Sequence, residues 1–328
     1  MYQMMSLPLY SGTFQEYDSW RDLGQELERL GCDGIEGVWG GEDLPKDLPA
    51  ELILGYHLIF YPDWLDFYRD DRAALKQKFG SLEAVASFYG GLGPDTLLEQ
   101  YRADLRRAVN LGARYVVFHV SDVSLEEGYT YRWLHTNQEV IDAAVEVVNL
   151  ILGEERWPFE FLVENQWWPG FTFTEPEETA RLLEGIRFAG KGILLDTGHL
   201  MNACTELKTE AEGADYIRRM LNRHGSLAKW VRGVHLHQSL SGAYVKAHTG
   251  SLPAGLPEDY MERFGVSYQH ILQIDQHRPW TDPAILPVLE QIEPRYLTHE
   301  LSSRGRMARA EAVSIQTRLL RQGGRMRV

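Results

Sequence analysis

A chain of 328 residues is long enough to bury most of its apolar surface in one large domain or two smaller ones, so it needs no disulfide framework. Its 47 acidic and 33 basic residues give a net charge of -14, which repels nucleic acid backbones and disfavours duplex DNA as a partner. The two cysteines, Cys32 and Cys204, lack CxxC spacing and favour a reducing, cytoplasmic setting. No signal-peptide pattern and no run of about 20 apolar residues is present, so we expect a soluble protein that binds neither nucleic acid nor a membrane.

Short apolar runs that end in polar residues alternate along the chain with stretches of helical periodicity. We expect strands near 2–9, 34–38, 52–60, 115–120, 159–164, 192–196, 233–237 and 296–300. We expect helices within 14–30, 94–112, 136–152, 175–186 and 282–292, where apolar residues recur three and four positions apart. About eight strands alternating with helices predict a (β/α)8 barrel, with a doubly wound open sheet as the alternative.

Two long segments, 61–93 and 239–276, are rich in aromatic residues, glycine and proline and match neither a single strand nor a clean helix. We expect them to form decorated loops on the catalytic face of the barrel. The chain has no internal repeat, low-complexity tract or Pro/Ser-rich linker. Residues 1–328 are therefore predicted to form a single domain.

Side chains that can bind a metal stand at the ends of successive predicted strands. They are His57, His119, Glu164, Asp196, His235 and Glu300. Barrel active sites are built at these strand ends. A lone histidine there is more often a hydrogen-bonded core residue, so the prediction depends on the combination. Three carboxylates in one apolar barrel mouth would resist ionisation unless a cation compensates them, and mixed histidine and carboxylate ligation suits zinc, manganese or iron.

Two histidines beyond these strand ends are further candidates. The glycine in Asp196-Thr-Gly-His199 permits a turn that brings His199 over the barrel mouth, while the alternative is that Asp196 only caps a helix. His235 and His237 are two residues apart on one predicted strand, so they should project from the same face, with His237 about 7 Å further out. His237 is expected either to contact substrate or to be solvated.

The loop that follows the strand ending at Glu164 is unusually aromatic, with the sequence Gln-Trp-Trp-Pro-Gly-Phe-Thr-Phe over 166–173. Trp167 and Trp168 should lie beside the expected site, where such rings favour a flat or ring-shaped ligand. The alternative is that the loop forms a hydrophobic lid or the contact of a homodimer.

These motifs resemble those of the xylose-isomerase-like barrels, which include sugar epimerases, myo-inositol catabolic enzymes and metal-dependent AP endonucleases. The resemblance covers nearly the whole chain and rests on Gly-Cys-Asp-Gly-Ile-Glu36, Val-Glu164-Asn165, Leu-Asp196-Thr-Gly-His199, Val-His235-Leu and His-Glu300. In the isomerase and epimerase branch, the residues that match Glu164, Asp196, His235 and Glu300 hold one metal, and the two glutamates exchange protons with the sugar.

The endonuclease branch has a larger cluster. The resemblance implies that His57 and His119 complete a second metal site bridged by Glu164, and that His199 and His248 match the ligands of a third. The chain departs from that pattern in Val-Lys246-Ala-His248, where the endonucleases have an aspartate and an arginine. Because a protonated lysine cannot bind a metal and repels a dication, we expect Lys246 to exclude the third metal and, with His199 and His248, to contact an anionic group of the substrate. The alternative is a solvated loop lysine.

The fuller match favours a hydrolase that holds one or two zinc or manganese ions and acts on a small-molecule phosphoester or phosphodiester. Paired metals in such an enzyme activate water and neutralise charge on the departing oxygen. One relative in this superfamily cleaves the nucleotide loop of cobamides, so the resemblance extends to a cobamide-type substrate. The alternatives are a metal-dependent sugar or sugar-phosphate isomerase or epimerase that uses Glu164 and Glu300 as base and acid, and a barrel that has lost catalysis and only binds.

Overall fold

Eight parallel strands form a closed barrel in the computed structural model, which describes residues 1–322. Consecutive strands pair around the ring, and β8 closes it against β1. The strands are β1 (Tyr2–Leu9), β2 (Gly34–Trp39), β3 (Ile53–His57), β4 (Tyr115–His119), β5 (Glu160–Glu164), β6 (Lys191–Asp196), β7 (Val231–His235) and β8 (Tyr296–His299). The predicted (β/α)8 barrel is confirmed, and the doubly wound alternative is excluded.

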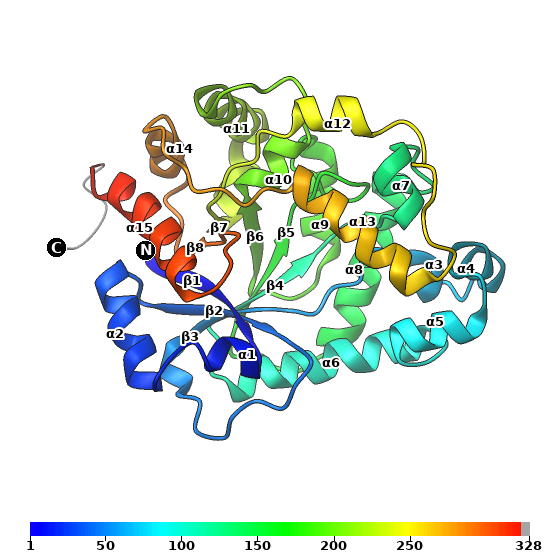
Figure 1. Cartoon of the computed structure of the whole chain (residues 1–328), viewed down its shortest axis with the longest axis horizontal. Coiled ribbons are helices and arrows are strands. Elements are labelled where there is room, and N and C mark those ends of the chain that lie inside the picture. The colour runs from blue at the N-terminus through cyan, green and yellow to red at the C-terminus, as the bar shows by residue number, and fades with distance from the viewer. Residues whose placement is uncertain (323–328) are drawn as a thin grey trace.

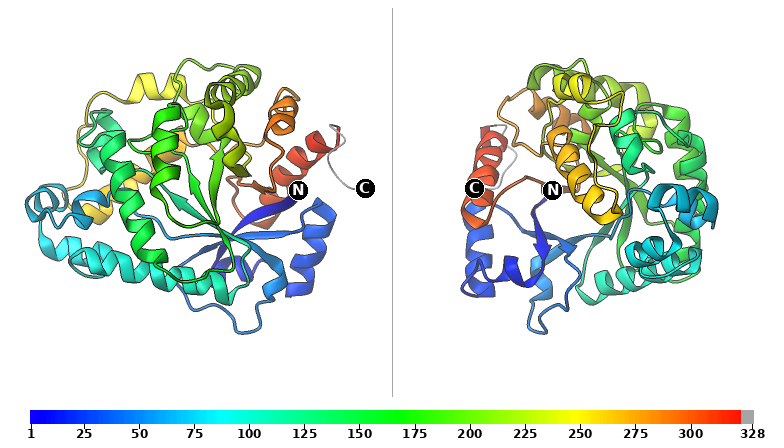
Figure 2. Two further views of the ribbon diagram at one scale, coloured as in Figure 1. Left: turned by 180° about the vertical axis from the view of Figure 1, so that it is seen from behind. Right: turned by 45° about the vertical axis from the view of Figure 1, so that its right-hand side comes forward.

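While a loop with a 3-10 turn joins β2 to β3, helices surround most of the barrel (Figures 1 and 2). They are α1 (Ser11–Phe14), α2 (Trp20–Leu30), α3 (Leu65–Tyr68), α4 (Arg72–Phe79), α5 (Leu82–Tyr89), α6 (Pro94–Asn110), α7 (Leu125–Thr130), α8 (Asn137–Leu152), α9 (Pro176–Gly185), α10 (Thr197–Asn202), α11 (Glu210–His224), α12 (Gly242–His248), α13 (Tyr260–Ile274), α14 (Ile285–Ile292) and α15 (Arg306–Gln322), with short 3-10 turns at Ala50–Leu52 and Gly225–Trp230. The five predicted helices are present. The two segments expected to be loops fold instead as α3 to α5 and as α12 and α13.

Local sequence fixes where several of these helices begin. At α7, α8 and α11 a serine or threonine side chain accepts a backbone N–H of the first turn, and a glutamate three residues later accepts the backbone N–H of the capping residue. These reciprocal bonds satisfy N–H groups that have no partner within the helix. The barrel helices consequently start at defined positions after their strands.

The lumen of the barrel is filled by apolar side chains below the level of the strand ends. They are Met4, Leu54, Tyr115, Val117, Leu162, Leu194 and Tyr296. Gly55 makes room for the largest of them, because a Cβ there would lie 2.3 Å from the Tyr115 ring. This packed layer closes the barrel floor, so the polar residues at the strand ends open only toward the carboxyl face.

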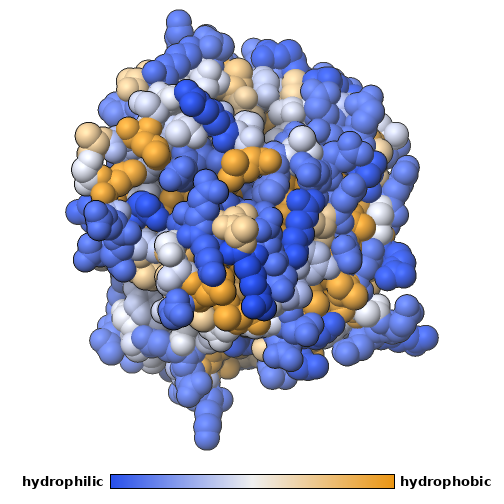
Figure 3. All heavy atoms as spheres, turned by 90° about the vertical axis from the view of Figure 1, so that its right-hand side faces the viewer, coloured by the Kyte–Doolittle hydropathy of each residue, from blue (hydrophilic) through white to orange (hydrophobic). Residues whose placement is uncertain are grey.

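Helix α13 lies beside α7 and α12 on the face at the right of Figure 1. That face is mostly hydrophilic, with apolar atoms exposed in separate small patches (Figure 3). Among the helices of residues 1–322, none is long and apolar enough to cross a membrane. Both cysteines are free. The cytoplasmic location expected from them stays a prediction.

Candidate metal centre

Four of the predicted residues converge at the carboxyl end of the barrel. One ligand atom each from Glu164, Asp196, His235 and Glu300 lies within 4.8 Å of the others, and we call this group the first cluster. Pairing of β6 with β7 sets Asp196 beside His235, and Glu300 directly follows β8. Nδ1 of His235 is central, because it lies 2.8 Å from Glu300 Oε2 and 3.3 Å from Glu164 Oε1.

The far nitrogen of His235 also has an acidic neighbour. His235 Nε2 lies 2.9 Å from Oε1 of Glu36, a carboxylate with no exposed surface. Oε2 of Glu36 accepts hydrogen bonds from Tyr115 at 2.6 Å and Thr298 at 3.0 Å. A carboxylate behind a histidine orients the ring and leaves its other nitrogen free to bind a metal. Sequence analysis noted Glu36 only within a family motif and missed this contact.

The second cluster consists of His57, His119 and Glu164. The β4–β5 register places His119 opposite Glu164, and the Nε2 atoms of His57 and His119 lie 3.3 and 3.1 Å from Glu164 Oε2. His57 Nδ1 donates to the backbone carbonyl of Leu58 at 2.8 Å. In the neutral ring this bond fixes the tautomer, so Nε2 of His57 would then carry the lone pair that a metal needs.

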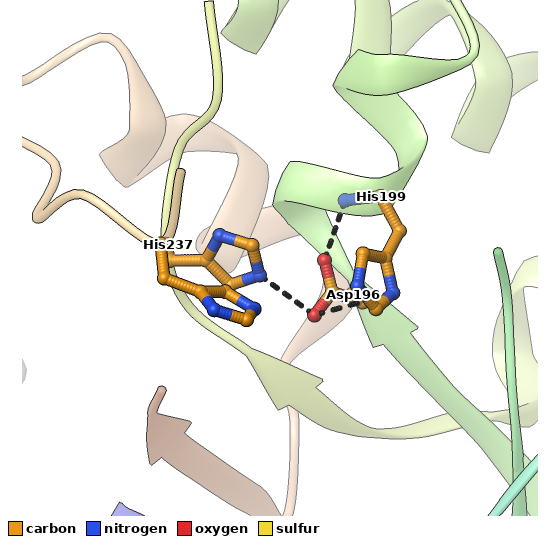
Figure 4. Close-up of side chains that lie close together, drawn as sticks. Asp196, His199 and His237 are labelled. Carbon is orange, nitrogen blue, oxygen red and sulfur yellow. Dashed lines mark hydrogen bonds and ion pairs between the residues drawn. The ribbon is translucent and has the colours of Figure 1, made fainter. Parts of the chain in front are cut away.

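The third cluster consists of Asp196, His199, His237 and His277. Figure 4 shows the carboxylate of Asp196 between His237 and His199. Oδ2 of Asp196 lies 2.8 Å from His237 Nε2, while Oδ1 accepts the backbone N–H of His199 at 2.6 Å and so caps α10. Asp196 thus caps α10 and also belongs to two clusters, while its role as a metal ligand stays a prediction.

His237 has a different position from the one expected. Strand β7 ends at His235, and His237 is fully buried in the third cluster rather than being solvated. The hydroxyl of Thr197 contacts the backbone carbonyl oxygens of both histidines and holds the chain between them. The two side chains consequently belong to separate clusters.

The structure corrects the prediction for Lys246 and His248. Both are exposed on α12, where the Lys246 ammonium pairs with Glu206 at 2.7 Å and the His248 ring stacks on Tyr244. Neither belongs to a cluster or lines the cavity above the barrel. Helix α12 directs this segment away from the barrel mouth, and this position favours the solvated alternative for Lys246.

Asp275 and His277 occupy the place that sequence analysis gave to that segment. Asp275 Oδ2 lies 3.2 Å from His199 Nε2 and 3.1 Å from His277 Nε2. His277 is not among the candidates named from the sequence, because α13, which ends just before it and brings it to the barrel mouth, was not recognised.

Buried atoms without partners test whether metal ions fit here. Within the described chain, both carboxylate oxygens of Glu164, both ring nitrogens of His235 and Oε2 of Glu300 are buried and make no well-aligned hydrogen bond, so their only close polar neighbours are the histidines and carboxylates of the clusters and Glu36. Such groups are costly to bury unless something compensates them. Histidine nitrogens and carboxylate oxygens together are the donors that zinc and manganese accept, so these residues fit divalent metals.

The histidines and carboxylates strongly shift each other's protonation. Burial raises the pKa of Glu164, but His119 and His235 outweigh it and hold the pKa well below its usual range. Burial lowers the pKa of His119 and outweighs the attraction of Glu164. An ionised carboxylate and a neutral imidazole are the forms in which both residues bind metals.

A cavity of about 490 Å³ opens onto the three clusters. His57, His119, His199 and Glu300 line it together with Trp167 and Trp168. The Trp167 ring lies 5.2 Å from the His199 ring and 4.2 Å from the Trp168 ring. Both tryptophans therefore lie beside the clusters, as sequence analysis expected, although their contact with a ligand stays a prediction.

A closed (β/α)8 barrel with histidine and carboxylate clusters at its carboxyl face defines the class of this protein. The family model described as xylose isomerase-like TIM barrel matches residues 25–293, and the chain belongs to this family. No curated protein matches the chain in sequence.

Several solved structures share the fold. Endonuclease IV from Thermus thermophilus is 16% identical with a TM-score of 0.54, and the match covers 98% of this chain and 100% of that one. A D-tagatose 3-epimerase-like protein is 15% identical with a TM-score of 0.53, covering 99% and 98%. The IolI protein, solved with a bound zinc atom, is 16% identical with a TM-score of 0.51, covering 98% of each chain. At these identities the likeness concerns the fold alone.

Proposed function

We propose that this protein is a metal-dependent hydrolase that cleaves a phosphoester or phosphodiester bond in a small molecule. The observation that carries the proposal is the position of Glu164 between clusters. Its Oε2 faces His57 and His119, and its Oε1 faces His199 and His235, at distances between 3.1 and 3.3 Å. A carboxylate with one oxygen toward each group would hold metals a few Å apart, which is the arrangement of multi-metal phosphoester hydrolases.

Zinc or manganese ions bound there would activate water and neutralise charge on the phosphoryl group. The protein residues then have separate tasks. Glu164 and Asp196 would hold the ions at fixed spacing, and Glu36 would orient His235 from behind. Glu300, whose side chain is 20% exposed and lines the cavity, is the first-cluster carboxylate that meets substrate directly. We assign it the transfer of a proton between water and the departing oxygen.

A metal-dependent sugar epimerase is the second candidate, and it is favoured by the proximity of Glu164 and Glu300 to one atom, Nδ1 of His235. An epimerase of this kind needs both carboxylates to reach a substrate carbon. Glu164 is surrounded by four histidines, has 1% of its side chain exposed and does not line the cavity. Its oxygens are therefore better placed to hold metals than to remove a proton from a sugar, which supports the hydrolase.

Metal content and activity together test the proposal. The purified protein, stripped with a chelator and reloaded with zinc or manganese, should bind two or more ions per chain and hydrolyse bis(p-nitrophenyl) phosphate only when loaded. His57→Gln should lower the metal content and the hydrolysis rate, whereas His248→Gln, on the exposed α12, should leave both unchanged. A single ion per chain, together with exchange of a ketose C–H proton for deuterium measured by NMR, would instead establish the epimerase.

A further inference from the structure

The cavity above the clusters has two kinds of wall. Toward the barrel it is lined by the histidines and carboxylates already described. Many side chains of its other walls are aromatic and come from separate parts of the chain, among them the segment after β3, the loop after β5, and α13. The main aromatic side chains are Phe60, Tyr61, Trp167, Trp168, Phe264 and Tyr268. Because elements far apart in the sequence supply rings to one space, the aromatic lining is a property of the cavity and not of one loop.

The aromatic walls begin directly at the clusters. The Phe60 ring lies 4.5 Å from the His119 ring of the second cluster. The Trp167 ring lies 5.2 Å from the His199 ring of the third cluster. A group bonded to an atom that reacts at the clusters would therefore enter the space between these rings at once.

The cavity has no protein cation that could meet an anionic part of a ligand. Within residues 1–322, neither a lysine nor an arginine lines it. His270 is held by hydrogen bonds with Tyr244 and the backbone carbonyl of Gly128. Since burying an anion without a partner is costly, charge on a bound molecule is compensated only at the clusters.

Some residues that line the cavity carry uncharged polar atoms without partners. Trp168 Nε1 and Ser267 Oγ are among them, since both are buried and make no hydrogen bond to any described residue. Both residues line the cavity. An indole N–H only donates and a hydroxyl can donate, so a neutral acceptor such as a ring nitrogen or a carbonyl oxygen would satisfy them.

From this lining we infer the substrate class, an inference that rests on the proposed phosphodiester hydrolysis. The substrate is a phosphodiester in which one ester group carries an uncharged aromatic ring with a hydrogen-bond acceptor. The ring occupies the cavity while the phosphoryl group lies on the clusters. In the reaction a water oxygen bonds to phosphorus, one phosphorus–oxygen ester bond breaks, and a water proton passes to the departing oxygen. Nucleic acid strands are poor substrates because the charge of their further phosphates extends beyond the clusters, and sugar monophosphates are poor substrates because they carry no aromatic ring that could fill the cavity.

Three synthetic diesters with the same p-nitrophenolate leaving group test this class on the metal-loaded protein. Their second ester group is methyl, 2-naphthyl or 6-carboxy-2-naphthyl. We expect kcat/KM for the naphthyl diester to exceed that for the methyl diester at least tenfold, because only the naphthyl ring fills the aromatic cavity. We expect kcat/KM for the carboxynaphthyl diester to be at least tenfold lower than that for the naphthyl diester, because no lysine or arginine of the described chain lines the cavity to pair with the added carboxylate.

Two variants and one control locate the effect. Trp168→Ala should lower the naphthyl-over-methyl preference at least fivefold. Tyr268→Lys, at a residue that is 51% exposed and so can be replaced without loss of folding, should raise kcat/KM for the carboxynaphthyl diester at least fivefold. Trp230→Ala, just before β7 at the opposite end of the barrel, should leave all three values unchanged.

The outcomes separate this inference from the proposed function. Equal kcat/KM for the methyl and naphthyl diesters would overturn the aromatic substrate while phosphodiester hydrolysis stands. If no diester is hydrolysed, binding of the neutral dye N-phenyl-1-naphthylamine decides the matter by fluorescence. If the protein binds the dye, and Trp168→Ala weakens this binding while Trp230→Ala leaves it unchanged, the aromatic cavity is supported and the proposed hydrolysis is overturned. Absence of dye binding would overturn the cavity inference as well.

Discussion

The substitution Gly198→Ala tests the third cluster without removing any side chain that could bind a metal. Gly198 is in the first turn of α10, and a Cβ built on it would lie 2.0 Å from Cε1 and 2.3 Å from Nδ1 of His237. Ordinary van der Waals contact begins at 3.4 Å, so the ring would have to withdraw by at least 1.4 Å. Metal–ligand distances tolerate roughly 0.2 Å, and the displaced His237 should therefore no longer share an ion with Asp196.

The effect on stability should be small beside this local effect. Overpacking a buried site costs about 1–3 kcal/mol, and replacing glycine by alanine in a helix returns up to about 1 kcal/mol. The variant should thus fold, with a free energy of unfolding lowered by no more than about 3 kcal/mol. Circular dichroism and urea denaturation would establish this before metal is measured.

The assay is zinc content per chain after saturation and gel filtration. Gly198→Ala should bind about one ion fewer than the wild type, with the first and second clusters still loaded. Gly24→Ala is the matched control, because it is also a helical glycine and no described atom lies within 4 Å of the added Cβ. A folded Gly198→Ala protein with wild-type zinc content would refute the assignment of His237 as a ligand.

Three further predictions concern charge. Glu164→Gln should lower the zinc content of the first and second clusters together. It should reduce the rate of diester hydrolysis by more than the roughly 10–100-fold that is typical when a residue behind a metal ligand is lost. An unchanged rate would contradict the bridging role of Glu164. Lys78→Met should lower the free energy of unfolding by about 3–5 kcal/mol in urea denaturation, because the Lys78 ammonium lies 2.6 Å from the buried Asp63 carboxylate. The control Lys76→Met, on the exposed face of α4, should lower it by less than about 0.5 kcal/mol. Burial lowers the pKa of His224 in the folded protein. The unfolded chain, in which the pKa of this residue is about 6.5, therefore binds more protons. The free energy of unfolding consequently decreases as the pH falls below about 6.5. His224→Gln should therefore lose less stability than the wild type between pH 7.5 and pH 5, and equal losses would exclude this residue as a cause.

The barrel and most of its polar strand ends could be predicted because they follow from local patterns. Apolar runs of strand length mark the strands, and the residue that ends each run, such as His119 or Glu164, must lie at the carboxyl face of a parallel barrel. The six strand-end residues named from the sequence do lie there, and Glu36 is one strand residue whose contact was missed. Their role as ligands remains a prediction.

The sequence by itself determined the fold, the face that carries the clusters and the residues of the first and second clusters, because each depends on one strand and its register. Only the tertiary structure decided the third cluster. Asp275 and His277 follow α13, and Lys246 and His248 are in α12, so their places depend on how two helices pack and not on any pattern within the segment. The same holds for the cavity, because its rings come from segments as far apart in the sequence as Phe60 and Tyr268, and only the packing of the folded chain brings them to one space.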